Sequence, residues 1–257
     1  YTPCARMQGM TIDAIPYAGE AFAYPLAAIQ ASLRVTTPRL LLICNPNNPT
    51  GTRLAPEAIL DLAASAPQTL VVVDELYEAF TGDSVLPAAD FSATPNLLVF
   101  RSLSKTAGLA ALRIGFAIGH PGVIDRVGRV TGPYEVNSVA VAAAFAALAD
   151  QSYVDAYVAE VLRARDWTVE ALRSAGIRHH CDGGNYLLVW PKQPVAAVDA
   201  ALRGEGILIR SMAGKPLVDG CFRVSIGTTS QMQRFVEAFL RLDPVSYTHL
   251  TLPTIMP

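Results

Sequence analysis

Three short, uninterrupted apolar runs constrain the fold of this 257-residue chain more than any other feature. They lie at residues 40–44 (LLLIC), 70–73 (LVVV) and 97–100 (LLVF). Runs of this kind, without alternating polar residues, are typical of strands buried on both faces of a parallel sheet. Between the first two runs, residues 55–64 show helical spacing of apolar side chains, with Pro56 at the start. The pattern therefore predicts parallel β-α-β units and an α/β fold.

The second half of the chain shows another alternation of helices and strands. Apolar side chains recur at helical intervals through residues 153–174, which predicts a long amphipathic helix. We expect it to lead from a large domain, residues 1–150, into a smaller one, residues 151–244. Beyond it the patterns predict strands at 186–190, 207–209 and 222–226 and helices at 195–203 and 231–242, while 114–118 is expected to add a strand to the first sheet.

Composition excludes two classes of partner. The 20 Lys and Arg residues against 22 Asp and Glu give a net charge of −2, so there is no large basic field to bind nucleic acid. No uncharged apolar run reaches the roughly 18 residues of a membrane span, and the strongest candidate, residues 139–149, is predicted to be a buried helix. The hydrophobic fraction of 51% and the charged fraction of 16% favour a buried sheet or a subunit interface.

Both ends of the chain look unusual. Tyr1 has no preceding methionine, and we expect the N-terminal part of the large domain to be missing. Residues 245–257 (VSYTHLTLPTIMP) are rich in Thr and Pro and carry no amphipathic period, so they are interpreted as a non-native tail. The four scattered cysteines form no CxxC pair, which predicts neither a metal site nor disulfides and favours a reducing cytoplasm.

A polar motif follows each of the three apolar runs. Residues 45–51 read NPNNPTG, residues 74–77 read DELY and residues 102–105 read SLSK. In open α/β sheets, ligands bind at the carboxyl ends of the strands. We therefore expect the three motifs to meet in one crevice, although NPNNPTG alone is also typical of a tight turn.

The side chains of these motifs match the chemistry of pyridoxal phosphate. Its aldehyde needs an amine for a Schiff base, its ring nitrogen needs a carboxylate to stay protonated, and its phosphate needs hydroxyl and guanidinium donors. Lys105 and Asp74 supply the amine and the carboxylate, and both are predicted to be catalytic. Once released from the cofactor, Lys105 is placed to act as general base at the substrate α-carbon. The predicted phosphate donors are Ser102, Ser104 and Arg113.

Together with the GLAALRIGF that follows SLSK, these motifs resemble those of the fold-type I aminotransferases, and among them most closely the histidinol-phosphate aminotransferases. The resemblance implies a three-layer αβα large domain with a mostly parallel sheet and a smaller C-terminal α/β domain. It also implies that Asn48 and Tyr77 bond to the cofactor's ring oxygen, with Tyr77 among the catalytic residues. Tyr1 stands where the family stacks an aromatic ring on the cofactor.

Two arginines of the second domain are candidates for substrate binding. Arg210 and Arg223 lie at or beside predicted strands, where an arginine needs an anionic partner. The resemblance implies that Arg223 binds the substrate carboxylate and that both arginines bind the phosphate of a histidinol-phosphate-type substrate. One bidentate arginine can serve either anion. An internal ion pair with Asp or Glu is the alternative interpretation.

The resemblance implies a homodimeric, cytoplasmic enzyme of histidine biosynthesis. Its reaction would move an amino group between glutamate and imidazole acetol phosphate, with no metal ion involved. A threonine-phosphate decarboxylase-like enzyme and an aromatic amino-acid aminotransferase share the same motifs and remain alternatives. A further alternative, of a different class, is an inactive truncated relative.

Overall fold

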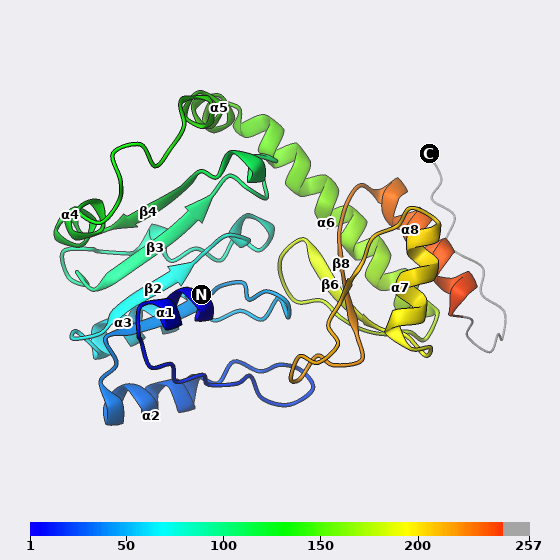
Figure 1. Cartoon of the computed structure of the whole chain (residues 1–257), viewed down its shortest axis with the longest axis horizontal. Coiled ribbons are helices and arrows are strands. Elements are labelled where there is room, and N and C mark those ends of the chain that lie inside the picture. Colours follow the sequence, from blue (N-terminus) through cyan, green and yellow to red (C-terminus); the bar gives the residue numbers. More distant parts are fainter. Residues whose placement is uncertain (244–257) are drawn as a thin grey trace.

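The computed structural model describes residues 1–243 and contains two four-stranded sheets (Figure 1). The predicted tail, residues 245–257, lies outside the described residues. In the first sheet the strand order is β1-β2-β3-β4, with β1, β2 and β3 parallel and β4 antiparallel to β3. These strands are β1 (Leu40–Cys44), β2 (Leu70–Asp74), β3 (Leu97–Ser102) and β4 (Gly115–Gly119).

The sequence patterns of the first sheet are confirmed in the structure. Helix α3 (Pro56–Ser65) begins at Pro56, and its apolar side chains Ile59 and Leu62 are buried against the strand residues Val71 and Val99. Strand β4 is antiparallel because the short β3–β4 connection carries only the 3-10 turn η3 (Ala110–Leu112) and no crossover helix. The other helices of this half are α1 (Thr2–Met7), α2 (Leu26–Thr36), α4 (Pro121–Gly128) and α5 (Ser138–Ala149).

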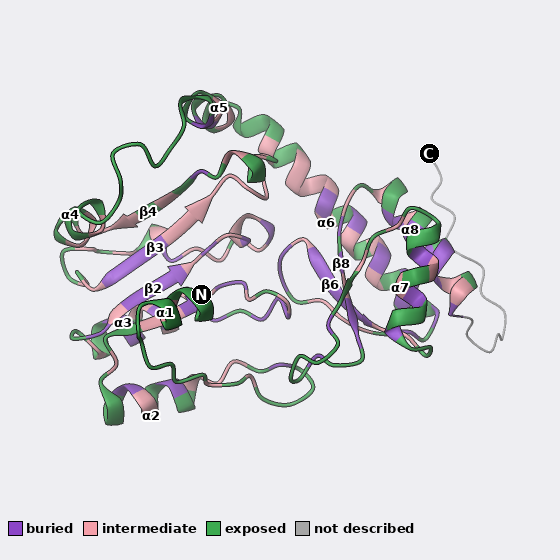
Figure 2. Cartoon of the chain, viewed as in Figure 1, coloured by how far each residue is buried: buried purple, intermediate pink, exposed green. Residues whose placement is uncertain are grey.

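The second sheet is antiparallel throughout, in the order β5-β6-β8-β7. The long helix α6 (Gln151–Ser174), which the amphipathic pattern predicts, connects the two sheets (Figure 1). The rings of Phe222, Phe235 and Phe239 pack at 5.5 to 6.2 Å in the core beneath this sheet, which is largely buried in Figure 2. The elements are β5 (Arg178–His180), β6 (Tyr186–Trp190), α7 (Val195–Gly204), β7 (Arg210–Ser211), β8 (Phe222–Ser225) and α8 (Thr229–Leu242).

Two predictions about buried segments are wrong. The strand expected at 207–209 lies instead at 210–211, because Ile207 still closes the end of α7 through its backbone N–H to Leu202 O. Helix α5 forms as predicted but is not buried, and Phe145 is 73% exposed. Only its small residues Ala140 and Ala144 are buried, so the helix contacts the rest of the chain along one narrow stripe (Figure 2).

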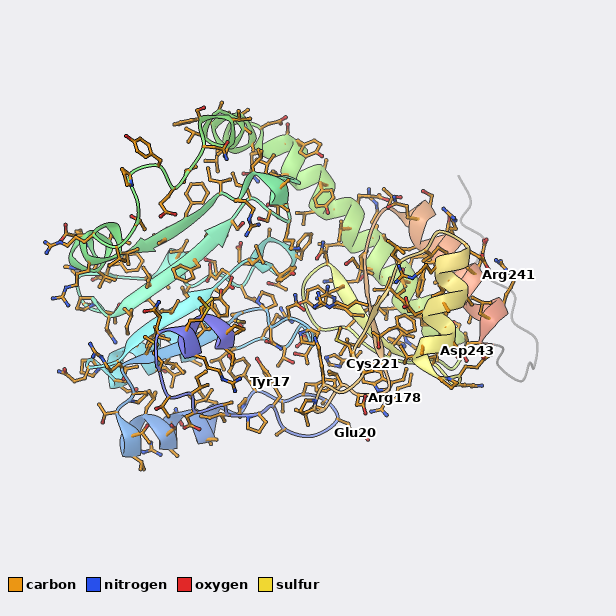
Figure 3. The ribbon with its side chains drawn as sticks, in the orientation of Figure 1. Tyr17, Glu20, Arg178, Cys221, Arg241 and Asp243 are labelled. Atoms are coloured by element: carbon orange, nitrogen blue, oxygen red, sulfur yellow. The ribbon has the colours of Figure 1, made fainter. Side chains whose placement is uncertain are left out.

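An N-terminal loop crosses from the first sheet to the second. Phe22 is 1% exposed and packs against Leu188 of β6, while Thr52 Oγ1 donates a hydrogen bond to Phe22 O over 3.1 Å. Glu20 and Arg178 lie side by side where this loop meets β5, 3.7 Å apart (Figure 3). The loop therefore holds the two halves of the molecule together at one side of the space between them.

None of the helices within residues 1–243 is long and apolar enough to cross a membrane. The same part of the chain contains no group of three or more His, Cys, Asp or Glu side chains arranged to hold a metal ion.

Candidate functional site

A cavity of about 350 Å³ lies where the carboxyl ends of β1 and β2 face the second sheet. Residues from both halves line it. Of the three motifs expected to meet in one crevice, NPNNPTG and DELY contribute lining residues, whereas SLSK does not. Six of the predicted site residues are among the lining residues: Tyr1, Asn48, Asp74, Tyr77, Arg210 and Arg223.

The NPNNPTG loop after β1 is braced by its own side chains. Asn45 is fully buried, its Nδ2 donates to Leu54 O over 3.0 Å, and its Oδ1 accepts from Leu54 N over 2.8 Å. Asn47 Nδ2 donates to Thr50 Oγ1 over 2.8 Å. This internal bonding holds the backbone of the loop and so fixes where Asn48 stands at the cavity.

The same loop packs directly against the second sheet. A Cβ atom added at Gly51, whose φ is +77°, would lie 2.5 Å from Gly183 N, so only glycine allows this approach. Tyr186 of β6 donates its hydroxyl to Asn47 O over 2.6 Å. Backbone contact and hydrogen bond together hold the second sheet at the cavity's edge.

Asp74 ends β2 and stands beside Cys44, its register partner on β1. Its Oδ1 accepts from Leu76 N over 3.0 Å, and its Oδ2 accepts a hydrogen bond from the hydroxyl of Tyr1. Burial, together with the Asp74 carboxylate, raises the pKa of Tyr1. The phenol of Tyr1 is thus held protonated as a donor to Asp74.

Tyr77 lines the cavity and contacts Asn48 and Lys105. Its hydroxyl accepts from Asn48 Nδ2 over 3.0 Å, and the Nζ of Lys105 lies 5.7 Å from its ring centroid. Burial raises the pKa of Tyr77 despite the opposing charge of Arg223. Because the phenol stays protonated and its oxygen already accepts from Asn48, its proton is free to be donated to a ligand.

The three predicted phosphate donors are placed differently. Ser102 and Ser104 bond to each other over 2.8 Å and do not line the cavity itself. Arg113 is exposed and donates to Ala110 O over 3.0 Å. The contacts of the described residues do not join these three side chains to the cavity, and their role in phosphate binding stays a prediction.

The two predicted arginines line the cavity from the second sheet. Arg210 and Arg223 are register partners on β7 and β8, so their side chains start from the same face. Arg223 Nη1 donates to Asn48 Oδ1 over 2.5 Å, and its guanidinium lies 5.5 Å from the ring centroid of Tyr186. Its Nε is buried and has no hydrogen-bond partner within residues 1–243.

Sequence analysis missed four residues of the site. Tyr186 was expected only as part of a strand, although it joins that strand to the NPNNPTG loop and packs edge-on against Tyr77 at 4.9 Å. Cys44, Met212 and Lys215 also line the cavity. Only the position of Cys44, at the end of a buried strand, gave a signal that could have found it.

Comparison with known proteins identifies the family. A family model described as aminotransferase class I and II matches residues 1–239. The chain belongs to this family. A histidinol-phosphate aminotransferase of Mannheimia succiniciproducens is 38% identical over 223 residues, which cover 85% of this chain and 60% of the relative. The chain spans about 60% of the length of the curated relatives it matches.

Solved structures show the same fold. The histidinol-phosphate aminotransferase of Sinorhizobium meliloti, crystallised with pyridoxal-5'-phosphate, superimposes with a TM-score of 0.82 at 24% identity and covers 94% of this chain and 66% of its own. The L-threonine-O-3-phosphate decarboxylase of Porphyromonas gingivalis gives 0.79 at 25% identity, covering 94% and 73%. The predicted fold class of a fold-type I aminotransferase is therefore confirmed.

Proposed function

We propose that this chain carries the cofactor and substrate sites of a pyridoxal-phosphate-dependent aminotransferase. Its reaction moves an amino group between glutamate and imidazole acetol phosphate, the step that forms histidinol phosphate in histidine biosynthesis. The observation that carries the proposal is that Asp74, Tyr77 and Arg223, distant in sequence, line one cavity, with Lys105 beside it. In this proposal residues 1–150 hold the cofactor, and residues 151–244 hold the substrate.

The side chains present fit pyridoxal phosphate. Lys105 supplies a primary amine beside Tyr77, and Tyr77 supplies a protonated phenol for the cofactor's ring oxygen, with Asn48 as the second donor. Asp74 supplies a carboxylate already oriented by the backbone of Leu76. When bound, the cofactor supplies an electron sink for the negative charge left at the substrate α-carbon.

Each residue then has one task. Asp74 keeps a proton at the ring nitrogen, because a carboxylate there favours the charged form of the ring. The free amine of Lys105 takes the proton from the substrate α-carbon and returns it during transfer. Tyr1, whose hydroxyl is bonded to Asp74 at the cavity, keeps its proposed role of stacking on the cofactor. For the cofactor's phosphate we keep the proposed donors Ser102, Ser104 and Arg113.

Arg210 and Arg223 bind the anionic end of the substrate in this proposal. Both arginines line the cavity, and they are register partners on β7 and β8. A bidentate arginine binds either a carboxylate or a phosphate, so glutamate and a phosphate ester can use one site in alternate halves of the reaction.

Binding of the cofactor is tested by absorbance. Mixing the chain with pyridoxal phosphate is expected to give a visible absorbance band, because an amine of the chain joins the aldehyde. Borohydride, which reduces the resulting C=N bond to a C–N bond, is expected to bleach this band and to leave the cofactor covalently attached. Lys105→Ala is expected to lose the band, whereas Lys192→Ala, which changes an exposed lysine outside the cavity, keeps it. A band that survives Lys105→Ala contradicts the proposal and favours the inactive-relative interpretation.

The reaction class is tested with two substrates. We expect transfer of the amino group from histidinol phosphate to 2-oxoglutarate, measured as glutamate formed. Threonine phosphate serves as the second substrate, since a threonine-phosphate decarboxylase is a structural neighbour of this chain. Release of carbon dioxide from threonine phosphate would reject the transaminase in favour of the decarboxylase.

We also propose that the protein is a cytoplasmic homodimer. The support is the apolar surface of α5, where Val139, Phe145 and Leu148 are 57 to 73% exposed. Exposed apolar surface of this kind is typical of an interface. Sedimentation is expected to give a dimer, and Phe145→Glu is expected to give a monomer with unchanged circular dichroism. A wild-type monomer contradicts the proposal.

A further inference from the structure

The chain contains only three lysines, and one of them, Lys215, lines the cavity and has no part in the proposed reaction. We infer that this residue, Lys215, is a third cation that binds the substrate's phosphate and makes the site select a dianionic phosphate monoester over a singly charged anion. The inference deepens the proposed function and rests on it. Lys105 already has a role, and Lys192 does not line the cavity.

Lys215 is carried on a fixed turn between β7 and β8. Its backbone N–H donates to Met212 O over 3.1 Å, and its own carbonyl accepts from Val218 N over 3.3 Å. Met212 and Val218 are 1% and 4% exposed and pack in one cluster with Cys221. The turn is therefore anchored at both ends, while Lys215 itself stays exposed at the cavity.

The cations at this side of the cavity have no anionic partner in the described chain. Arg210 and Arg223 face each other across β7 and β8, an arrangement of like charges that destabilises a sheet unless an anion joins them. Within residues 1–243, no carboxylate oxygen lies within 4.0 Å of the charged nitrogens of Arg210, Lys215 or Arg223. Asp74, the one acidic residue among the described lining residues, is bonded to Tyr1.

One donor atom of Arg223 is buried without a partner among the described residues. The Nε of Arg223 is buried without a hydrogen-bond partner in the described residues, although its Nη1 is bonded to Asn48. Leaving a buried charged donor unpaired is costly, so the site is completed when an acceptor oxygen enters the cavity. The oxygens of a bound phosphate satisfy this requirement.

The number of cations matches a phosphate monoester better than a carboxylate. A phosphate monoester carries nearly two negative charges at pH 7, because its second pKa is about 6. One guanidinium is enough for a carboxylate, whereas a tetrahedral phosphate has three free oxygens to be bonded. Lys215 adds a point charge with three donors on a flexible stem to the planar forks of Arg210 and Arg223.

Calorimetric titration of the chain tests the inference. The ligands are histidinol phosphate, O-phosphoethanolamine and unphosphorylated L-histidinol. Lys215→Gln is expected to raise the Kd of both phosphate esters about fivefold, as for a partly exposed ion pair, and to leave the Kd of L-histidinol unchanged. The matched control Lys192→Gln is expected to change none of the three. In the wild type, the preference for esters is expected to decline as the pH falls through about 6, and less so in Lys215→Gln.

The outcomes separate this inference from the proposed function. Three results would overturn the role of Lys215. The wild type and Lys215→Gln could bind both esters with equal Kd values, or Lys215→Gln could raise the Kd of L-histidinol as much as that of the esters. In the third, the wild type would bind neither ester measurably. If both esters depend on Lys215 but histidinol phosphate binds no more tightly than O-phosphoethanolamine, the proposed substrate is wrong and the role of Lys215 stands.

Discussion

Replacing Gly51 with alanine tests how closely the NPNNPTG loop packs against the second sheet. Gly51 has a φ of +77°, and an added Cβ would lie 2.5 Å from Gly183 N and 2.6 Å from Gly183 O. Both of these neighbours are backbone atoms, so they cannot move aside as the end of a flexible side chain would. The methyl group must therefore push β6 and its Tyr186 away from the loop.

The expected loss of stability has two parts, one from the backbone conformation and one from the steric overlap. A second glycine, Gly82, measures the first part alone. Gly82 has nearly the same φ, +76°, but no atom lies within 4 Å of its added Cβ. For Gly82→Ala we expect a loss of about 1 kcal/mol in the free energy of unfolding, from the left-handed backbone alone. For Gly51→Ala the steric overlap adds roughly 2 kcal/mol, so the loss is about 3 kcal/mol.

Equilibrium unfolding in urea measures both variants against the wild type. Because the Tyr186–Asn47 bond and the Arg223–Asn48 bond cross the same junction, Gly51→Ala is also expected to weaken the visible band formed with pyridoxal phosphate. Gly82→Ala is expected to keep that band. Equal losses of stability in the two variants would refute the close packing of Gly51 on Gly183.

Two further predictions concern buried charge and alkaline pH. Arg101→Ala leaves the fully buried carboxylate of Glu75 without its 2.8 Å partner, so we expect a loss of about 3 kcal/mol in the free energy of unfolding. Arg53→Ala, which breaks two more exposed pairs, with Asp83 and Asp182, should cost less than about 1 kcal/mol. Similar costs for both variants would argue against the buried pair. Burial raises the pKa of Cys44 from 9.0 to about 11. The neutral thiol therefore stabilises the fold below pH 9, and this contribution is lost as the pH rises through about 11. Between these pH values, the free energy of unfolding measured in urea should fall less steeply with pH for Cys44→Ala than for the wild type. The same pH dependence in both proteins would contradict the prediction.

Local patterns in the sequence were sufficient for most of the fold. The apolar runs at 40–44, 70–73 and 97–100 are strands because an uninterrupted run suits a strand covered on both faces. The strand predicted at 207–209 was wrong, because apolar character alone does not show where α7 ends and where pairing with β8 begins. The predicted burial of α5 was also wrong, because an apolar sequence does not show whether the same chain provides a surface to cover the helix.

The sequence also predicted part of the site. Asp74, Asn48 and Tyr77 were placed in one crevice because parallel strands bring their carboxyl ends to the same edge. The rule does not extend to side chains on the loop after β3, and the structure leaves Arg113 exposed and bonded to Ala110. Tyr186 could not be found, because its bond joins residues 139 positions apart.

The sequence by itself determined the kinds of side chain available and the elements that carry them, since periodicity and turn chemistry act over a few residues. Only the tertiary structure decided which of these side chains meet. It brought Arg223 to Asn48 over 175 positions and set Lys215 beside the same cavity. The physical reason is that such meetings depend on how two sheets pack, through contacts such as Gly51 on Gly183, and no local pattern encodes that packing.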